Sequence, residues 1–271
     1  MTEQPMLLAL WSVPRSRSTA FERAMYERGD FLVIHEPFSR VSDFGEVDVE
    51  GRTCTTQDQV MAALVEVAAD RPVFFKDTTD FRIDGLAANP DFLKRCRHAA
   101  MYRNPGDTVR SHLVMQADAP SEAMGFGNLW EIVSAVTDAG LPMHLVDGDR
   151  LADGPEAEMR RYCEAVGIAF VAESLAFRRE PPASWKATGR WHAGASESNA
   201  LGASPAGKKQ LSGELENIAL AFEQDQLPYY ERIRETLGGA VAQRVRRAPK
   251  PVPGQHEQRM RVRLRMTGDR I

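Results

Sequence analysis

Two arginines and three hydroxyl side chains follow an apolar run near the start of the chain, in the segment PRSRST, residues 14–19. This composition suits an anion site, because the free N–H groups and positive dipole end of a helix start favour negative charge. Arg15 can add a bidentate contact, and Ser16, Ser18 and Thr19 can donate hydroxyl hydrogens. Ser18 or Thr19 is also suited to cap the helix. A capped helix with surface arginines is the alternative.

A second candidate anion site is the segment YRNPGDTVRS, residues 102–111. An apolar strand ends at Arg103, and Pro105 suits the first position of a helix. Ser111 follows one to two helical turns later, so a strand-end arginine and a helical hydroxyl can hold one phosphate from two sides. Because Arg-Asn-Pro turns are common, this segment alone is weak evidence for an anion site. It is informative only together with the first segment.

Candidate proton-transfer groups follow two other strands. VIHEPFS places His35 and Glu36 just past one strand end, and VFFKDTTDF places Lys76 and Asp77 at another. Ligands of doubly wound sheets bind outside the carboxyl ends of the strands, where these side chains meet the anion segments. Glu36 could instead cap a helix or form an ion pair, and His35 could be a hydrogen-bonded strand-end residue. Lys76 could instead extend toward solvent and pair with Asp77.

The elements that position these residues alternate along the chain. Short, almost continuously apolar runs predict strands over residues 7–13, 31–35, 73–76, 99–103 and 144–147. Helical patterns lie at 19–28, 56–69, 106–115, 128–139 and 155–166. This alternation predicts an α/β fold: a three-layer, doubly wound, mostly parallel sheet of about five strands with a P-loop-like first strand, loop and helix.

Beyond residue 170 the alternation fades. Residues 179–209 are rich in Gly, Ala, Ser and Pro and predict a long loop, a length that favours a functional role. Its tryptophans, Trp185 and Trp191, could stack on a base, line a pocket or pack against the core. Two helices are predicted over 213–224 and 228–237. We assign residues 1–243 to one domain and 244–271 to a basic tail or an added edge strand.

The net charge of −4 is unevenly distributed over the 271 residues. Residues 244–271 hold nine Lys or Arg against two acidic residues, a net charge of +7, which leaves −11 for the rest. An acidic body argues against nucleic-acid binding, whereas the basic tail suits a partner protein or a second copy of the chain.

No apolar run approaches the roughly 20 residues that span a bilayer. Without such a run, we expect a cytoplasmic protein that binds no membrane. Three widely spaced cysteines predict reduced thiols and no metal site.

The two anion segments together resemble the nucleotide-binding motifs of sulfotransferases that use 3′-phosphoadenosine 5′-phosphosulfate (PAPS). PRSRST is similar to their 5′-phosphosulfate loop, P-[KR]-S-G-[ST]-T, and YRNPGDTVRS to their 3′-phosphate motif, R-[ND]-P followed about eight positions later by Ser. Two stretches give support: HLVDGDRLADGPEAEMRRYCEAVGI looks like the family's strand, acidic-Leu turn and helix, and SWKATGRWHAGAS like its basic loop over the nucleotide. The resemblance spans roughly residues 7–196.

The resemblance implies a role for each matching residue. Arg15, Ser16, Ser18 and Thr19 bind the 5′-phosphosulfate, Arg103 and Ser111 bind the 3′-phosphate, and Lys186 and Arg190 lie in the closing loop. Glu36 is the expected base, with His35 as second choice, while Lys76 and Arg15 act on the bridging oxygen of the leaving nucleotide. Arg17, grouped with the cofactor-binding residues, stands where the family usually has glycine. Either it lies in a turn of different shape, or it points outward and binds the acceptor or nothing.

The implied reaction is transfer of a sulfuryl group from PAPS to a hydroxyl of a small-molecule acceptor. It proceeds by in-line displacement with a carboxylate base, releases adenosine 3′,5′-bisphosphate and needs no metal. The alternative is a degenerate or partner-dependent relative that binds nucleotide or a sulfated substrate, with sulfate as leaving group, and transfers nothing from PAPS. A P-loop kinase or hydrolase is disfavoured, because the sequence lacks Gly-Lys-[ST] in this loop.

Overall fold

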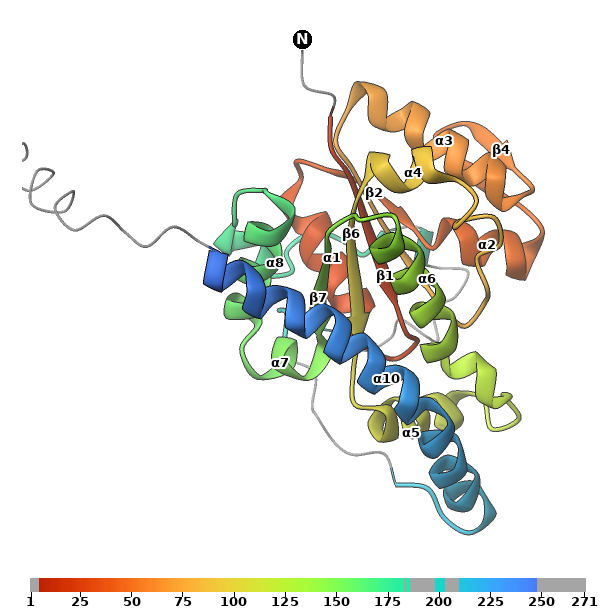
Figure 1. The fold of residues 1–271 in the computed structure, drawn as a ribbon. Helices are drawn as coiled ribbons and strands as arrows, with labels where there is room; N and C mark the ends of the chain where they lie inside the picture. Colours follow the sequence, from red (N-terminus) through yellow and green to blue (C-terminus); the bar gives the residue numbers. More distant parts are fainter. Residues whose placement is uncertain (1–4, 183, 186–197, 203–209, 248–271) are drawn as a thin grey trace, which may run out of the picture.

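The computed structural model describes residues 5–182, 184–185, 198–202 and 210–247, with 239–247 described by their backbone only. Five strands form the central sheet (Figure 1): β1 (Leu7–Ser12), β2 (Leu32–His35), β5 (Val73–Thr78), β6 (Cys96–Tyr102) and β7 (Met143–Asp147). Their order is β2-β5-β1-β6-β7, and every neighbouring pair is parallel. The predicted α/β fold and its five strands are therefore confirmed.

Helices cover both faces of the sheet and complete three layers (Figure 1). On one face lie α1 (Ser18–Arg28) and α8 (Pro155–Val166), where the rings of Phe21 and Tyr162 meet edge to face with centroids 4.8 Å apart. The other face is covered by α3 (Gln57–Asp70), α6 (Phe126–Asp138) and α10 (Glu214–Arg247). Because both faces are covered, all six residues of β1 are buried, as its apolar sequence predicts.

The central position of β1 decides what meets at the carboxyl edge of the sheet. β1 pairs with β5 on one side and with β6 on the other, so the loop after β1 lies between the ends of those two strands. At the same edge α2 (Pro37–Phe44) follows β2, α5 (Pro105–Met115) follows β6 and α7 (Gly148–Asp153) follows β7. The two predicted anion segments and the candidate base are thus brought to one edge.

Several short helices and strands were not predicted from the sequence. They are α2, α7, α4 (Pro90–Arg95), the antiparallel hairpin β3 (Val47–Val49) and β4 (Arg52–Cys54), and the 3₁₀ turns η1 (Ser121–Met124) and η2 (Ala172–Leu175). Each has too few residues to establish a periodic pattern. The three cysteines are buried and unpaired, as predicted. Within the described part of the chain, no helix has the length and apolar composition to cross a membrane.

The prediction of two C-terminal helices is wrong. A single helix, α10, holds Pro228 in its interior. Proline disfavours this position because it lacks an N–H group and clashes with the preceding turn. Burial on both sides of the proline compensates, since Ala219 and Ile233 are fully buried in the same core. The helix runs across the assigned boundary at residue 243, and residues 248–271 lie outside the described residues.

Candidate active site

The connection between β1 and α1 is a tight turn that contains left-handed residues. Arg15 has φ 61° and Arg17 has φ 73°, a region that residues other than glycine rarely adopt. The Ser16 hydroxyl donates to the Val13 carbonyl at 2.7 Å. From the other side, a Cβ added at Gly148 would lie 2.3 Å from the Ser16 carbonyl oxygen, so the start of α7 supports the turn closely. Arg17 adopts the backbone conformation that the motif's glycine would favour.

The prediction that Ser18 or Thr19 caps the first helix is wrong. The helix begins at Ser18, the cap position is Arg17, and the Arg17 side chain makes no capping hydrogen bond. Ser18 is buried in the first turn and Thr19 is half-buried. A helix start whose cap residue makes no capping hydrogen bond, preceded by a turn that contains arginines, has the N–H donors and the dipole that anion sites use.

Three guanidinium groups gather at this turn. Nε of Arg15 donates to Oγ of Ser111 in α5 at 3.1 Å, a hydrogen bond that joins the two predicted anion segments. Burial, and then the nearby charge of Arg103, lowers the pKa of Arg15. The same two causes lower the pKa of Arg17. The cations therefore lie close enough to repel one another in a partly desolvated place.

Carboxylates hold Arg103 in position at the end of β6. Its Nε donates to Asp149 of α7 at 2.9 Å, and a second nitrogen donates to Asp107 of α5 at 3.2 Å. The backbone N–H of Asn104 donates to the other Asp149 oxygen at 3.1 Å. The Arg103 side chain remains 13% exposed, so it stays within reach of a ligand.

The donor set fits a sulfated and phosphorylated nucleotide. Nε of Arg17 is buried and has no hydrogen-bond partner among the described residues. Such an orphaned donor is rare in a folded protein and points to an acceptor that arrives with a ligand. The hydroxyl of Ser16, in contrast, is engaged with the turn itself. Lys186 and Arg190, predicted in the closing loop, lie outside the described residues.

Glu36 stands at the junction of β2 and α2 in a left-handed conformation, with φ 48° and ψ 49°. Its N–H donates to the Lys76 carbonyl at 2.8 Å, and its carbonyl accepts from the N–H of Arg40 at 2.9 Å. Glu36 occupies the cap position of α2, but its side chain makes no capping hydrogen bond. The carboxylate is therefore directed to other partners.

Those partners are Lys76 and His35. The Lys76 ammonium forms an ion pair with Oε1 of Glu36, and its side chain is only 1% exposed. Nε2 of His35 lies 3.4 Å from the other oxygen, Oε2. Burial opposes the charge on Lys76, but the carboxylates of Glu36, Glu22 and Asp77 outweigh it and raise the pKa of this lysine. Lys76 is thus a fixed buried cation beside the candidate base.

Asp77 has a different task. Its carboxylate accepts from the N–H groups of Phe38 at 2.6 Å and of Ser39 at 3.1 Å, and so caps α2 from the neighbouring strand. Burial raises the pKa of Asp77 to about 7, against the hydrogen bond from Ser39. The alternative that Lys76 pairs with Asp77 is replaced by the pair of Lys76 with Glu36. Asp77 instead fixes the helix that begins just after Glu36.

Glu22, a fully buried residue of α1, belongs to no motif that the sequence presents. Both of its oxygens lie near Nδ1 of His35, at 3.0 and 2.9 Å. Nε1 of Trp185, from the predicted long loop, donates to Oε1 of Glu22 at 3.2 Å. The one feature of the sequence that could have indicated a buried Glu22 is its place beside the apolar face of the helix, between Phe21 and Met25.

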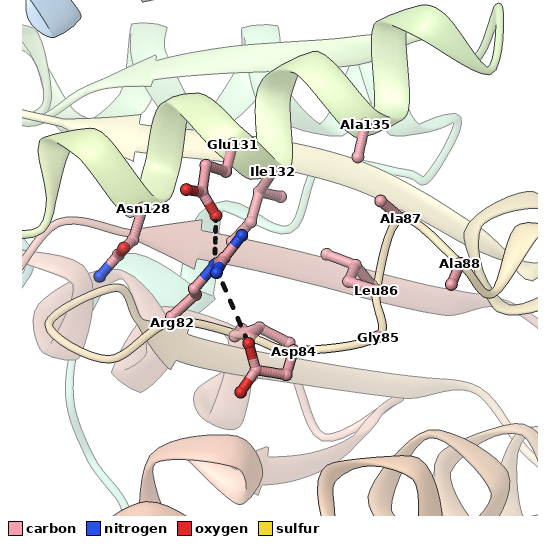
Figure 2. A pocket seen from close by; sticks show the side chains of 11 residues that line it. Arg82, Asp84, Gly85, Leu86, Ala87, Ala88, Asn128, Glu131, Ile132 and Ala135 are labelled. Atoms are coloured by element: carbon pink, nitrogen blue, oxygen red, sulfur yellow. Dashed lines mark hydrogen bonds and ion pairs between the residues drawn. The ribbon is translucent and has the colours of Figure 1, made fainter.

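A separate pocket of about 220 Å³ lies between residues 82–88 and α6 (Figure 2). In it, Arg82 forms a 2.8 Å ion pair with Glu131 and lies 3.9 Å from Asp84. None of the predicted site residues lines this pocket. Arg82 is 67% exposed and already neutralised by two carboxylates, so we assign the pocket no part in the site.

These features define an α/β protein with an arginine-rich turn after its first strand and a carboxylate–lysine–histidine cluster at the same sheet edge. The chain matches the family described as Sulfotransferase domain over residues 6–235. It belongs to this sulfotransferase family, and that membership supports sulfuryl transfer as its general chemistry.

Individual relatives are distant. Branched-chain-amino-acid aminotransferase-like proteins 1 and 2 of Arabidopsis thaliana are 25% and 26% identical to this chain over 186 and 179 residues. The matches cover 66% and 63% of this chain but 33% and 32% of those proteins, so the chain spans about a third of their length. The sulfotransferase domain of the Synechococcus PCC 7002 olefin synthase has a TM-score of 0.50 and 13% identity, covering 82% of this chain and 95% of that one. This likeness shows the fold alone.

Proposed function

We propose that the protein transfers the sulfuryl group of PAPS to a hydroxyl of a small-molecule acceptor. The observation that carries this proposal is the gathering of Arg15, Arg17 and Arg103 at one helix start, whose cap residue makes no capping hydrogen bond. Burial and like charge make this cluster unfavourable without an anion. A nucleotide with a phosphosulfate and a separate 3′-phosphate supplies negative charge to both anion segments at once.

We assign the 3′-phosphate to Arg103 and Ser111, and the phosphosulfate to Arg15, Arg17 and the first turn of α1. When bound, PAPS supplies the sulfuryl group and a nucleotide leaving group. Arg15 and Lys76 stabilise the negative charge that develops on the bridging oxygen, as fixed cations do in phosphoryl transfer. Glu36 accepts the proton of the acceptor hydroxyl while the new O–S bond forms and the bond to the bridging oxygen breaks.

Calorimetry with two nucleotides tests the donor assignment. We expect adenosine 3′,5′-bisphosphate to bind with a micromolar or lower Kd, and adenosine 5′-monophosphate, which lacks the 3′-phosphate, to bind more weakly. Arg103→Ala and Ser111→Ala should weaken the bisphosphate roughly 10- to 100-fold, since a hydrogen bond to a charged group contributes about 1.5–3 kcal/mol. They should leave the monophosphate unchanged. Arg97→Ala, at the amino end of the same strand β6, is the matched control.

Binding of neither nucleotide to the wild-type protein would refute the proposal. If the bisphosphate binds, Glu36→Gln separates a transferase from a binding protein. The proposal predicts that this variant keeps its affinity and loses transfer of labelled sulfate from PAPS to a panel of alcohols and phenols. Nucleotide binding without any transfer by the wild-type protein would favour the degenerate or partner-dependent relative instead.

A further inference from the structure

Glu22 is a charged residue without exposed surface, in the layer of α1 that covers the sheet. Burying a carboxylate is costly unless hydrogen bonds and opposite charges compensate. Here the compensation comes from Nδ1 of His35, at 3.0 and 2.9 Å, and from the indole N–H of Trp185, at 3.2 Å. The Lys76 ammonium also interacts electrostatically with Glu22. The carboxylate is thus enclosed by donors and positive charge, and two of these partners, His35 and Lys76, are candidate site residues.

The contact with Glu22 decides which nitrogen of His35 exchanges a proton. Nδ1 faces a carboxylate, which can only accept, so Nδ1 carries hydrogen in both protonation states of the ring. The proton is therefore gained and lost at Nε2. That nitrogen lies on the side of Glu36, 3.4 Å from Oε2, while Oε1 of Glu36 is paired with Lys76.

We propose that Glu22 is a positioning residue for a proton relay in which His35 takes over the proton that Glu36 removes from the acceptor. This inference rests on the proposed function. As the acceptor O–S bond forms and the electron pair of the donor S–O bond leaves with the nucleotide, the acceptor proton moves to Oε2 of Glu36. It then passes to Nε2 of His35, and the resulting imidazolium is stabilised by the Glu22 carboxylate. Product release returns the proton to water.

The charges around His35 favour this direction of transfer. Among the described residues, Glu22 approaches from α1, Glu36 from the start of α2, and Lys76 lies beside it in register on β5. Protonation of His35 leaves two cations between two carboxylates, which is electrically neutral. Without His35, a protonated Glu36 would leave Lys76 paired with a neutral acid, so the relay restores the ion pair for the next turnover.

The first test measures the imidazole directly and needs no acceptor. Nitrogen chemical shifts of labelled histidines in the full chain should show His35 protonated at Nδ1 throughout a pH titration, with the change confined to Nε2. In Glu22→Gln, the titration should move to lower pH, because the imidazolium loses its anionic partner. A neutral His35 with its hydrogen on Nε2, or a titration that does not respond to Glu22→Gln, would overturn the inference. If Glu22→Gln does not fold, the wild-type tautomer alone decides.

The second test uses sulfate transfer from labelled PAPS. Glu22→Gln should lower kcat roughly 10- to 100-fold and move the acid limb of its pH profile to lower pH, with the affinity for adenosine 3′,5′-bisphosphate unchanged. Glu158→Gln removes the charge of another fully buried carboxylate, in α8, and should leave the profile in place. In a His35→Gln background, Glu22→Gln should have no further effect. Additive losses would refute the relay, whereas loss of nucleotide binding by the wild type would refute the proposed function.

Discussion

Replacing Lys76 with methionine tests the central ion pair of the site. Methionine retains much of the buried volume but leaves the Glu36 carboxylate without its cation. The two side chains are 1% and 13% exposed, so solvent screens the remaining charge only weakly. Removing one member of a buried pair costs about 3–5 kcal/mol. Because Glu36 keeps some exposure and has His35 at 3.4 Å, we expect a loss near the lower end, about 3 kcal/mol of unfolding free energy.

Urea unfolding of wild type, Lys76→Met, Glu36→Gln and the double variant measures this effect. If the charges are coupled, the double variant is more stable than the sum of the single losses predicts, by at least about 1.5 kcal/mol. Lys94→Met, at an exposed position of α4, is the matched control and should change stability by less than about 0.5 kcal/mol. A coupling below about 0.5 kcal/mol, at which independent sites simply add, would refute the ion pair as a source of stability.

Two other substitutions test the arginine-rich turn between β1 and α1 and a buried histidine. Gly148→Ala should weaken binding of adenosine 3′,5′-bisphosphate roughly tenfold or more in calorimetry, because the new Cβ would lie 2.3 Å from the Ser16 carbonyl oxygen. Gly154→Ala, with its nearest neighbour at 3.9 Å, should keep the affinity, and equal affinities in both variants would contradict the reasoning. Burial lowers the pKa of His98 from 6.5 to about 4, so between these values the unfolded chain binds a proton that the native chain does not, and stability falls as the pH falls. Asp77, whose pKa is raised to about 7, makes the native chain more stable as the pH falls, and so opposes the effect of His98. To remove the contribution of Asp77, the quantity to measure is the unfolding free energy of wild type minus that of His98→Gln. This difference should shrink by up to about 3 kcal/mol from pH 6.5 to pH 4, and a constant difference would contradict it.

The sheet could be predicted from sequence because its strands are covered on both faces. A strand such as Leu7–Ser12, with every side chain buried, has an apolar sequence that needs no tertiary information to interpret. The helices between the strands bury one face each, so their sequences alternate with a helical period. The short helices and the hairpin have no such pattern, and α10 passes through Pro228 only because both sides of it pack against the core.

The site could be predicted less well, because its pairings depend on strand register. Lys76 and Asp77 are neighbours in sequence, which suggested an ion pair between them. Successive side chains of a strand point to opposite faces, so Lys76 shares the α1 face with Phe74 while Asp77 lies on the other. The register that aligns His35 with Lys76 then brings Glu36 to the lysine. Sequence spacing alone contains none of this information.

Strand order also explains how one sheet edge can hold a cation cluster and a carboxylate base without mutual neutralisation. A carboxylate beside Arg15 and Arg17 would pair with them and lose its value as a proton acceptor. β1 lies between β5 and β6, so the arginines after β1 adjoin those of the β6 side, where Asp107 and Asp149 hold Arg103. The base follows β2 at the opposite edge strand and has its own cation on β5. Each side therefore has its own counterions: Asp107 and Asp149 pair with Arg103, and Lys76 pairs with Glu36. In the proposed reaction, the arginine side would attract the anionic donor and the Glu36 side would accept the proton.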